Sequence, residues 1–452
     1  MIIDTDASFD VDDVVAICLA HALQDRGEAE IRAIVHDAGI PEGIGAVSVL
    51  NHFYGRDDIL LGAYKGNFGK DPNNNGWVRG AYVDDLVNNW DSPIRDSSQV
   101  MEATEVYRKV LSEAEDNSIV ISSIGFVTNI ANLLQSQPDQ YSALNGYDLV
   151  AQKVKTVVWQ GGWYPPIHGW GHETYNWDCG RGFYNTDGCD GASEIGVNQM
   201  PPNVEMVYGD IGDETICGRE LSYCTDRSNP CRAALEDQQG YGNGRSCWDP
   251  VMTLRAVRPD LSQFLSEAGE GDGRVKVNYW GANTWEEGNI PNHKWLVLNG
   301  AWDGDWNQVD NARRGLENLI DDLLCAVPKP QGGPIVNLGN DKCLAADSDD
   351  NVPNDYTNVI NDNCYESNAQ IWRLEGDQLK HSSSGKCLDM DANNGNEVVI
   401  YNCFGPEWQN WSYQNGKIIN RSNGQCLDIR DRDVYVTECN DSPTQNWQIN
   451  DD

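Results

Sequence analysis

The C-terminal part of the chain repeats one short pattern three times, and no other feature restricts the fold as strongly. Each copy holds two cysteines and ends in a Gln-x-Trp triplet, at a period of about forty residues. The copies span residues 342–372, 386–411 and 425–447. A unit this short cannot bury a core alone, so the three copies must share one. We expect their tryptophans inside that core and a disulfide closing the loops of each copy.

This pattern resembles the ricin-B-type lectin family, whose fold is an all-β β-trefoil. The resemblance covers residues 335–452. It implies one disulfide within each copy, namely Cys343–Cys364, Cys387–Cys403 and Cys426–Cys439. It also implies a glycan as a partner of this domain, because members of the family bind sugars.

The sugar-binding residues of that family are matched unevenly. Members hold a pyranose with an Asp two residues after the first cysteine and an aromatic residue two before the second. The second copy has both, Asp389 and Tyr401. The third copy combines Asp428 with Thr437, and the first has Ala345 at the Asp position. No copy has the family's Asn before the Gln of Gln-x-Trp. We expect sugar binding mainly at the second copy; the alternative is a trefoil kept as a stabilising or protein-contact module.

The rest of the chain alternates short apolar runs with amphipathic stretches. Continuous apolar runs are typical of buried parallel strands, and they occupy residues 1–4, 30–35, 58–64, 118–125, 155–162 and 204–210. Helical spacing is found between them, at 11–25, 98–115 and 128–136, and again at 308–326. This alternation predicts an open, mostly parallel, Rossmann-like α/β sheet with ligand sites at the carboxyl ends of its strands.

A Pro- and Gly-rich stretch separates the two parts. Residues 327–334 cannot continue a helix, so we interpret them as a linker between a first domain, 1–326, and a second, 335–452.

The formal net charge of −38 limits the partners of the protein. A nucleic-acid polymer or an anionic membrane would be repelled by this charge, and no apolar run has the length needed to span a bilayer. Bound cations and neutral substrates such as nucleosides are compatible with it. The sequence leaves the oligomeric state open, a homo-oligomer included.

Fourteen cysteines favour an oxidising compartment, so we expect an extracellular, secreted protein. The chain starts at Met1 with no basic and apolar leader, so the leader has been removed or export takes another route. Cys179–Cys189 and Cys224–Cys231 are predicted to close short loops. The remaining cysteines cannot be paired from the sequence: Cys18, Cys217, Cys247 and Cys325.

Five aspartates lie in the strand–loop–helix segment that begins the chain: Asp4, Asp6, Asp10, Asp12 and Asp13. Carboxylates gathered at the end of a strand repel one another unless a cation compensates them. One or two of them could instead stabilise the start of the helix, but not all five. Hard oxygen ligands favour calcium or magnesium over zinc, so the segment predicts a divalent-metal site.

Asp4-Thr5-Asp6 followed by Asp12-Asp13 resembles the DTD…DD signature of the inosine/uridine-preferring nucleoside hydrolases. Three further family segments are matched in the same order, by Ile124–Asn129, by Glu173 with Asn176, and by Trp248-Asp249-Pro250. The resemblance spans residues 1–325. It implies a calcium-dependent hydrolase that cleaves the N-glycosidic bond of a nucleoside or another N-riboside and releases base and ribose.

The same resemblance assigns roles to individual residues. Asp6 would be both a calcium ligand and the base that activates the attacking water, and the other ligands would be Asp13, Asp249 and the main-chain carbonyl of Ile124. The substrate would be held by Asp12, Glu173 and Asn176 at the ribose hydroxyls and by Trp248 at the base. In many members a His stands where this chain has Trp248 and protonates the leaving base. The proton donor is therefore unassigned, with His168 and His172 as candidates.

Two other functions compete with this interpretation. Residues 1–8 also resemble the start of haloacid-dehalogenase-type phosphatases, with Asp4 as nucleophile, Asp6 as acid and Gly209–Asp213 as a late metal motif. The third interpretation is a catalytically silent carbohydrate-binding protein. Aromatic residues in the segment 160–185 either line a substrate pocket or pack that segment against the domain.

Overall fold

The structure of the protein, a computed structural model, describes residues 1–449 except 72, 74–75, 163–173, 214, 269–272, 289–291, 327, 329–331, 349–352, 366 and 391–396. The chain divides into two compact units, Met1–Pro328 and Lys329–Asp452. The first strand of the second unit begins at Gly333, inside the stretch interpreted above as a linker.

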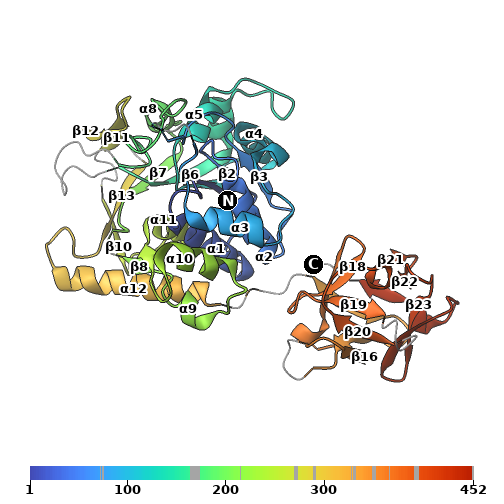
Figure 1. Cartoon of the computed structure of the whole chain (residues 1–452). Helices are drawn as coiled ribbons and strands as arrows, with labels where there is room; N and C mark the ends of the chain where they lie inside the picture. Colours follow the sequence, from blue (N-terminus) through green and yellow to red (C-terminus); the bar gives the residue numbers. More distant parts are fainter. Residues whose placement is uncertain are drawn as a thin grey trace. The chain divides into compact units, whose positions relative to one another are not determined.

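A nine-stranded sheet forms the centre of the N-terminal unit (Figure 1). Its strand order is β10-β13-β7-β6-β5-β1-β2-β3-β4. All neighbours are parallel except β10, which pairs antiparallel with β13 at one edge. The strands are β1 (Ile2–Thr5), β2 (Ala33–His36), β3 (Leu60–Ala63), β4 (Met101–Glu102), β5 (Ile119–Ser123), β6 (Val154–Gln160), β7 (Glu205–Gly209), β10 (Leu265–Ala268) and β13 (His293–Leu298). The predicted open, mostly parallel α/β sheet is thus confirmed.

Helices cover both faces of this sheet (Figure 1). Neighbouring residues of one strand belong to different apolar cores: Ile3 packs with α1 and α11, whereas Ile2 packs with α4 and α5. The helices are α1 (Asp12–Asp25), α2 (Gly43–Phe53), α3 (Ala81–Asn89), α4 (Ala103–Glu113), α5 (Thr128–Gln135), α6 (Gly146–Lys153), α8 (Ala192–Asn198), α9 (Leu221–Cys224), α10 (Pro230–Gln239), α11 (Trp248–Val257) and α12 (Trp306–Leu324). Two-stranded sheets join β8 (Ile216–Cys217) to β9 (Arg245–Ser246) and β11 (Gly273–Val277) to β12 (Asn283–Glu287). Because both faces are covered, the central strands are mostly apolar, with polar residues toward their carboxyl ends.

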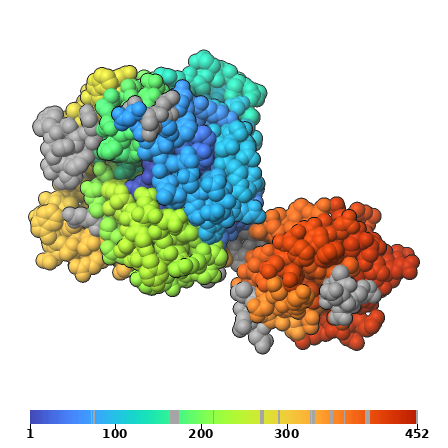
Figure 2. Space-filling model, in the orientation of Figure 1, coloured from blue at the N-terminus to red at the C-terminus, as the bar shows by residue number. Residues whose placement is uncertain are grey.

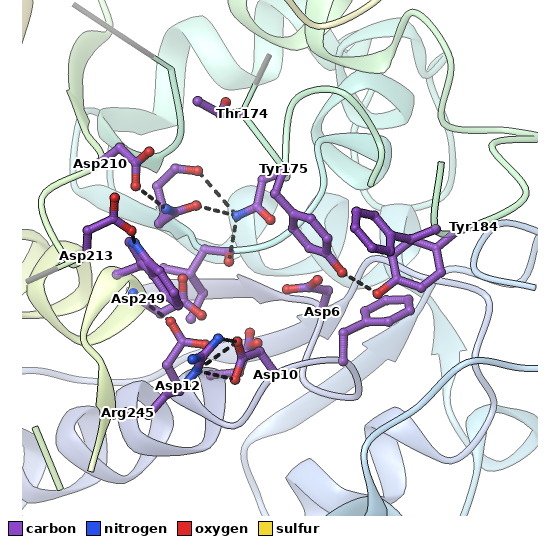
Figure 3. Close-up of a pocket in the computed structure, with 17 residues that line it drawn as sticks. Asp6, Asp10, Asp12, Thr174, Tyr175, Tyr184, Asp210, Asp213, Arg245 and Asp249 are labelled. Carbon is purple, nitrogen blue, oxygen red and sulfur yellow. Dashed lines mark hydrogen bonds and ion pairs between the residues drawn. The ribbon is translucent and has the colours of Figure 1, made fainter. Parts of the chain in front are cut away.

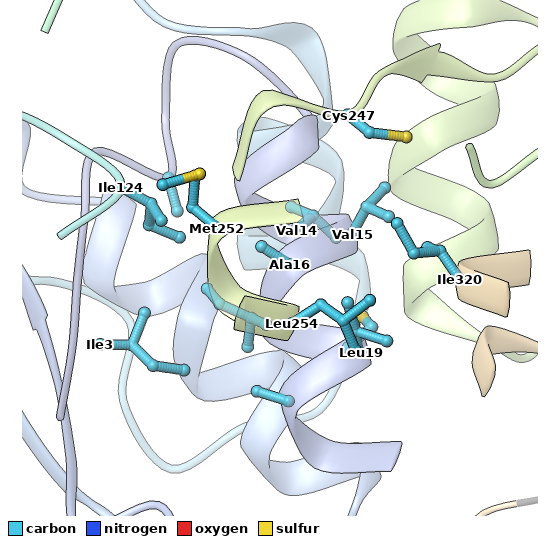
Figure 4. Packing of buried hydrophobic residues seen from close by; sticks show 14 of the residues in the cluster. Ile3, Val14, Val15, Ala16, Leu19, Ile124, Cys247, Met252, Leu254 and Ile320 are labelled. Atoms are coloured by element: carbon cyan, nitrogen blue, oxygen red, sulfur yellow. The ribbon is translucent and has the colours of Figure 1, made fainter. Parts of the chain in front are cut away.

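Helices α1 and α11 pack against each other (Figure 4). Val14 and Leu19 of α1 and Met252 and Leu254 of α11 are all fully buried in this contact region. The first turns of both helices carry aspartates. Packing the two helices together therefore brings carboxylates from distant parts of the sequence to one place.

All fourteen cysteines form disulfides, which corrects one prediction. Cys224 and Cys231 do not pair with each other. Cys231, buried in the first turn of α10, pairs with Cys18 of α1 because α10 packs on α1. Cys224, at the end of α9, instead reaches Cys325 just after α12. The predicted pair Cys179–Cys189 is present, and the remaining two cysteines of this unit form Cys217–Cys247.

The C-terminal unit is all-β and contains each predicted disulfide. The indole N–H groups of Trp372, Trp411 and Trp447 donate to carbonyls of Leu344, Leu388 and Leu427 at 3.0, 2.9 and 3.0 Å, and all three rings are buried in one core. The strands are β14 (Gly333–Asn337), β15 (Lys342–Ala346), β16 (Thr357–Asn363), β17 (Ile371–Glu375), β18 (Gln378–His381), β19 (Cys387–Met390), β20 (Val398–Tyr401), β21 (Trp411–Gln414), β22 (Lys417–Asn420), β23 (Cys426–Arg430), β24 (Asp433–Thr437) and β25 (Trp447–Ile449). Equivalent contacts in the three copies confirm the shared core of a β-trefoil.

Within the described residues, no helix combines the length and the apolar character needed to cross a membrane.

Candidate functional site

A pocket of about 510 Å³ lies in the N-terminal unit at the carboxyl ends of β1, β5, β6 and β7 (Figure 3). Strands β1 and β5 are neighbours from which the chain continues to opposite sides of the sheet, and open α/β sheets bind ligands at such a point. The space-filling view shows this unit hollowed between segments coloured blue and green (Figure 2). The lining residues are Asp6, Phe9, Asp10, Asp12, Asp13, Ile124, Gln160, Thr174, Tyr175, Asn176, Phe183, Tyr184, Asp210, Asp213, Arg245, Trp248 and Asp249.

Buried carboxylates form one wall of the pocket. Asp12 and Asp13 in the first turn of α1 and Asp249 in the first turn of α11 each offer an oxygen, and these oxygens lie within 4.8 Å of one another. Asp6 follows β1 and lines the same pocket as Asp13. The main-chain N–H of Asp249 donates to Asp12 at 3.3 Å, and the Thr5 hydroxyl donates to Asp13. The predicted metal ligands are therefore brought together, and Asp12, predicted to hold ribose, lies among them.

This arrangement is electrostatically costly without a cation. Burial, and after it the charge of the neighbouring carboxylates, raises the pKa of Asp6, Asp12 and Asp249 well above the usual range. Asp37, just after β2, is also fully buried, and neither of its carboxylate oxygens has a hydrogen-bond partner in the described part of the chain. An all-oxygen, acidic donor set with unsatisfied buried charge fits a hard divalent cation such as calcium or magnesium.

The turn after β5 holds the ends of three strands together. Asn129 donates to the Asp4 carboxylate at 2.8 Å, and the Thr128 hydroxyl donates to the main-chain oxygen of Asp37 at 2.5 Å. A Cβ atom on Gly125 would lie 2.3 Å from an Asp37 carboxylate oxygen and 2.5 Å from the Asp6 nitrogen. Only glycine permits this approach, which places the predicted carbonyl ligand of Ile124 in the pocket.

Of the residues predicted to hold the ribose, the structure describes Asp12 and Asn176. The Asn176 amide is buried and donates to the carbonyl of Ile124 at 3.1 Å and to the side chain of Gln160 at 2.6 Å. Glu173 lies outside the described residues, as do both candidate proton donors, His168 and His172. Asn176 thus lines the pocket and also restrains the carbonyl of Ile124.

Aromatic side chains form the opposite wall. The rings of Phe9 and Tyr184 lie 4.3 Å apart between centroids, and the hydroxyls of Tyr175 and Tyr184 are hydrogen-bonded to each other. Phe183 is 67% exposed at the rim, and the disulfide Cys179–Cys189 closes the loop that carries it. Both alternatives for the segment 160–185 apply to its described aromatic residues. Tyr175, Phe183 and Tyr184 line the pocket, whereas Trp177 is buried in an apolar core.

Several pocket residues were not found by sequence reasoning. Arg245 of β9 donates through its Nε to both carboxylate oxygens of Asp10, at 2.9 and 3.0 Å, which gives Asp10 a partner. The guanidinium also lies 4.8 Å from the Trp248 ring centroid, and the Trp248 indole donates to Asp213 at 2.9 Å. The sequence gives a single indication that Arg245 belongs to the pocket: it lies three residues before Trp248.

The second and third copies of the trefoil share a buried polar pair. The Gln409 amide donates to Asp389 at 2.7 Å, and the Gln445 amide donates to Asp428 at 2.9 Å. In the first copy Ala345 is buried at the Asp position and offers no carboxylate.

Residues 331–447 match the family model of the ricin-type β-trefoil lectin domain. The solved structures similar to this lectin-type domain include the hemolytic lectin CEL-III, with 25% identity over 27% of this chain and 31% of its own, and a TM-score of 0.24. Another is the β-trefoil lectin of the Vibrio vulnificus hemolysin/cytolysin with N-acetyl-D-lactosamine bound, with 23% identity over 26% of this chain and 93% of its own, and a TM-score of 0.24.

The N-terminal unit also has a similar solved structure, but no curated protein sequence matches the chain. A plant nucleoside hydrolase enzyme is 19% identical over 72% of this chain and 98% of its own, with a TM-score of 0.49.

Aromatic rings lie on the surface of the second copy of the lectin-type domain. Tyr401 lies 4.8 Å from Tyr356 and 5.6 Å from Phe404 between ring centroids, and Trp408 lies 6.3 Å from Phe404. Tyr356 and Phe404 are exposed. The second copy therefore combines a buried carboxylate, Asp389, with accessible aromatic rings.

Proposed function

We propose that the protein is a calcium-dependent hydrolase that cleaves the N-glycosidic bond of ribonucleosides and carries a carbohydrate-binding domain. The observation that carries this proposal is the convergence of Asp12, Asp13 and Asp249 in one pocket with Asp6. These aspartates belong to the segments that resemble the nucleoside hydrolases. The Trp248 ring, which lines the same pocket, suits the flat base of a nucleoside.

The residues that would hold calcium are Asp6, Asp13, Asp249 and the Ile124 carbonyl, with Asp12 beside them. A cation held there supplies Lewis acidity, which makes a water-derived nucleophile available near neutral pH. Asp6 accepts the proton of the attacking water. The ribose hydroxyls are held by Asp12 and Asn176, together with Glu173.

The carboxylates also act on the transition state. As the bond between the anomeric carbon and the base nitrogen breaks, positive charge develops on the ribose ring. Preorganised negative groups stabilise that charge strongly inside a pocket from which water is largely excluded. The buried position of Asp6 and Asp12 therefore favours the oxocarbenium-like state over the neutral substrate.

The phosphatase alternative requires Asp4 as an accessible nucleophile. Asp4 is fully buried, and its two oxygens accept from Tyr107 at 2.7 Å and from Asn129 at 2.8 Å. It does not line the pocket. This geometry supports a structural role for Asp4 and favours the hydrolase over the phosphatase.

For the C-terminal domain we propose glycan binding at the second copy, through Asp389 and Tyr401, with Asp428 as the weaker site. The seven disulfides support an extracellular, oxidising location for the whole protein.

A substrate panel tests the proposed activity. The full chain is incubated with five common ribonucleosides and with p-nitrophenyl phosphate, after chelation and again after calcium is restored. We expect ribose release that chelator abolishes and calcium restores. Asp6→Asn should lower turnover at least about 100-fold, whereas Asp303→Asn, at an exposed aspartate far along the sequence, should leave it unchanged. Phosphate release without ribose release would support the phosphatase, and inactivity with retained glycan binding would support the silent lectin.

A further inference from the structure

The proposed reaction lacks a proton donor for the leaving base, because Trp248 cannot supply one. We propose that Asp210 is the general acid that protonates this base, an inference that rests on the proposed N-ribosidic hydrolysis.

Asp210 lines the same pocket as Trp248, the residue proposed to hold the base. It directly follows β7 and lines the pocket beside Gln160, whose amide donates to Oδ1 at 3.2 Å. Within the described residues nothing hydrogen-bonds to Oδ2, so this oxygen is available to carry a proton toward a ligand. Figure 3 shows Asp210 and Asp213 on the opposite side of the view from Tyr175 and Tyr184.

The loop that carries Asp210 packs directly on the start of α11. A Cβ atom on Gly212 would lie 2.2 Å from the Trp248 nitrogen, so only glycine allows the loop to come this close. The Trp248 indole then donates to Asp213 at 2.9 Å. The loop that carries Asp210 is therefore held against Trp248, whose ring is proposed to stack on the base.

The other titratable groups in the described lining are unsuited to this role. Arg245 is paired with Asp10, and a guanidinium does not give up its proton in this pH range. Burial raises the pKa of Tyr175 and Tyr184, whose hydroxyls bind each other. The carboxylates at the cation site must be ionised to hold it, and Asp213 is exposed at the rim.

The surroundings of Asp210 favour its protonated form. Burial, and then the charge of Asp213, raises the pKa of Asp210 to about 7. The other charged groups of the described pocket are the Asp10–Arg245 pair and the carboxylates at the cation site. A general acid is most effective when its pKa lies near the working pH.

The proton transfers balance over one turnover. The C–N bond breaks as its electron pair passes to the base, and the Asp210 carboxyl proton moves to a ring nitrogen of that base. Water forms the new C–O bond and loses a proton to Asp6. Asp6 then releases this proton to solvent, and Asp210 takes one up, so that riboside and water yield ribose and neutral base.

The role of Asp210 as general acid is tested with two substrates, of which only one has a leaving group that must be protonated. Asp210→Asn is assayed, in the calcium-loaded full chain, on inosine and on p-nitrophenyl β-D-ribofuranoside, whose leaving group departs without a proton. We expect kcat on inosine to fall about 100-fold or more, while kcat on the nitrophenyl riboside falls less than about threefold. An equal loss on both substrates, or no loss on inosine, would overturn the proposal.

The pH profile gives a second, independent readout. The wild-type kcat on inosine should fall as the pH rises through the pKa of the acid, and Asp210→Asn should remove this alkaline limb. In Asp213→Asn the limb should move to lower pH, because a repelling charge is gone. A limb that persists in Asp210→Asn, or one lost only in His168→Ala or His172→Ala, would also overturn the proposal. Failure of the wild type on every riboside would instead refute the proposed function.

Discussion

Without a divalent cation, the N-terminal unit should become less stable as the pH rises, and calcium should offset part of this loss. Burial is the first cause of the raised pKa values of Asp6, Asp13 and Asp249. An acid whose folded-state pKa exceeds its unfolded value binds more protons in the native state. Its stabilising effect is complete below the unfolded pKa and is lost as the pH rises through the folded pKa.

Asp4 alone gives a lower bound for this loss of stability. Each extra proton held by the native state lowers the free energy of unfolding by about 1.4 kcal/mol per pH unit. The pKa of Asp4 is raised by burial from 3.8 to about 7. Asp4 alone therefore contributes a loss of about 4 kcal/mol between about pH 4 and pH 7. At about 2 °C per kcal/mol for a domain of this size, the melting temperature falls by about 8 °C, and the other buried carboxylates add to this.

Calcium binds the ionised carboxylates, so its benefit should increase with pH. At a calcium concentration about 100 times the Kd, the folded state gains about 2.7 kcal/mol, or about 5 °C. Calorimetric melts of the full chain, with chelator or calcium, should show this gain near pH 8 and almost none near pH 4. The trefoil transition is an internal reference and should not respond to calcium. Asp249→Asn should lose the gain, and Asp303→Asn should keep it. A gain that is independent of pH, or a chelated protein that becomes more stable as the pH rises, would refute the reasoning.

Three further substitutions have defined outcomes. Tyr401→Ala should strongly reduce retention on immobilised glycans without changing either melting transition, because the ring is part of a surface cluster; undiminished retention would place the main sugar site elsewhere. Trp411→Ala should lower the stability of the trefoil by about 3–5 kcal/mol, measured by denaturant unfolding, because its buried ring and its hydrogen bond to Leu388 are lost together. Gly125→Ala should lower the stability of the N-terminal unit by about 1–3 kcal/mol and reduce ribose release, because its Cβ would overlap Asp37; wild-type activity would contradict the proposed tight turn.

The sequence predicted the interior of the sheet better than its edge. The six apolar runs became β1, β2, β3, β5, β6 and β7, because strands buried on both faces are continuously apolar. Three strands were missed: β10, β13 and the two-residue edge strand β4 (Met101–Glu102), which lies inside the stretch predicted as helical. In the antiparallel edge strand β10 (Leu265–Ala268) the two middle residues, Ser and Glu, are polar. β13 (His293–Leu298) begins with His and Lys, although its last four residues form a buried apolar run like those of the interior.

In the candidate site, too, the residues that are close together in the sequence were easier to predict than those that are far apart. Asp6, Asp12 and Asp13 are close in the sequence, so their convergence could be predicted from one segment. Asp210 directly follows β7 and Arg245 lies in the two-residue strand β9, and both are far in the sequence from the aspartates at the start of the chain. The pairing of Cys224 failed for this reason as well: short spacing favoured Cys231, but the helix packing directs Cys231 toward α1.

Without a cation, the carboxylates of the acidic pocket repel one another, and two features of the fold oppose this repulsion. Asp12 and Asp249 both lie in the first turn of a helix, where the partial positive charge of the helix terminus stabilises a carboxylate. A covalent restraint acts on each helix too. Cys18 joins α1 to α10, and Cys247, directly before α11, is joined to Cys217 of β8. Because folding and disulfide formation already oppose the repulsion, cation binding needs little further ordering of the chain. The repulsion between these carboxylates would destabilise a fold without such restraints. In this fold the carboxylates form a preorganised cation site.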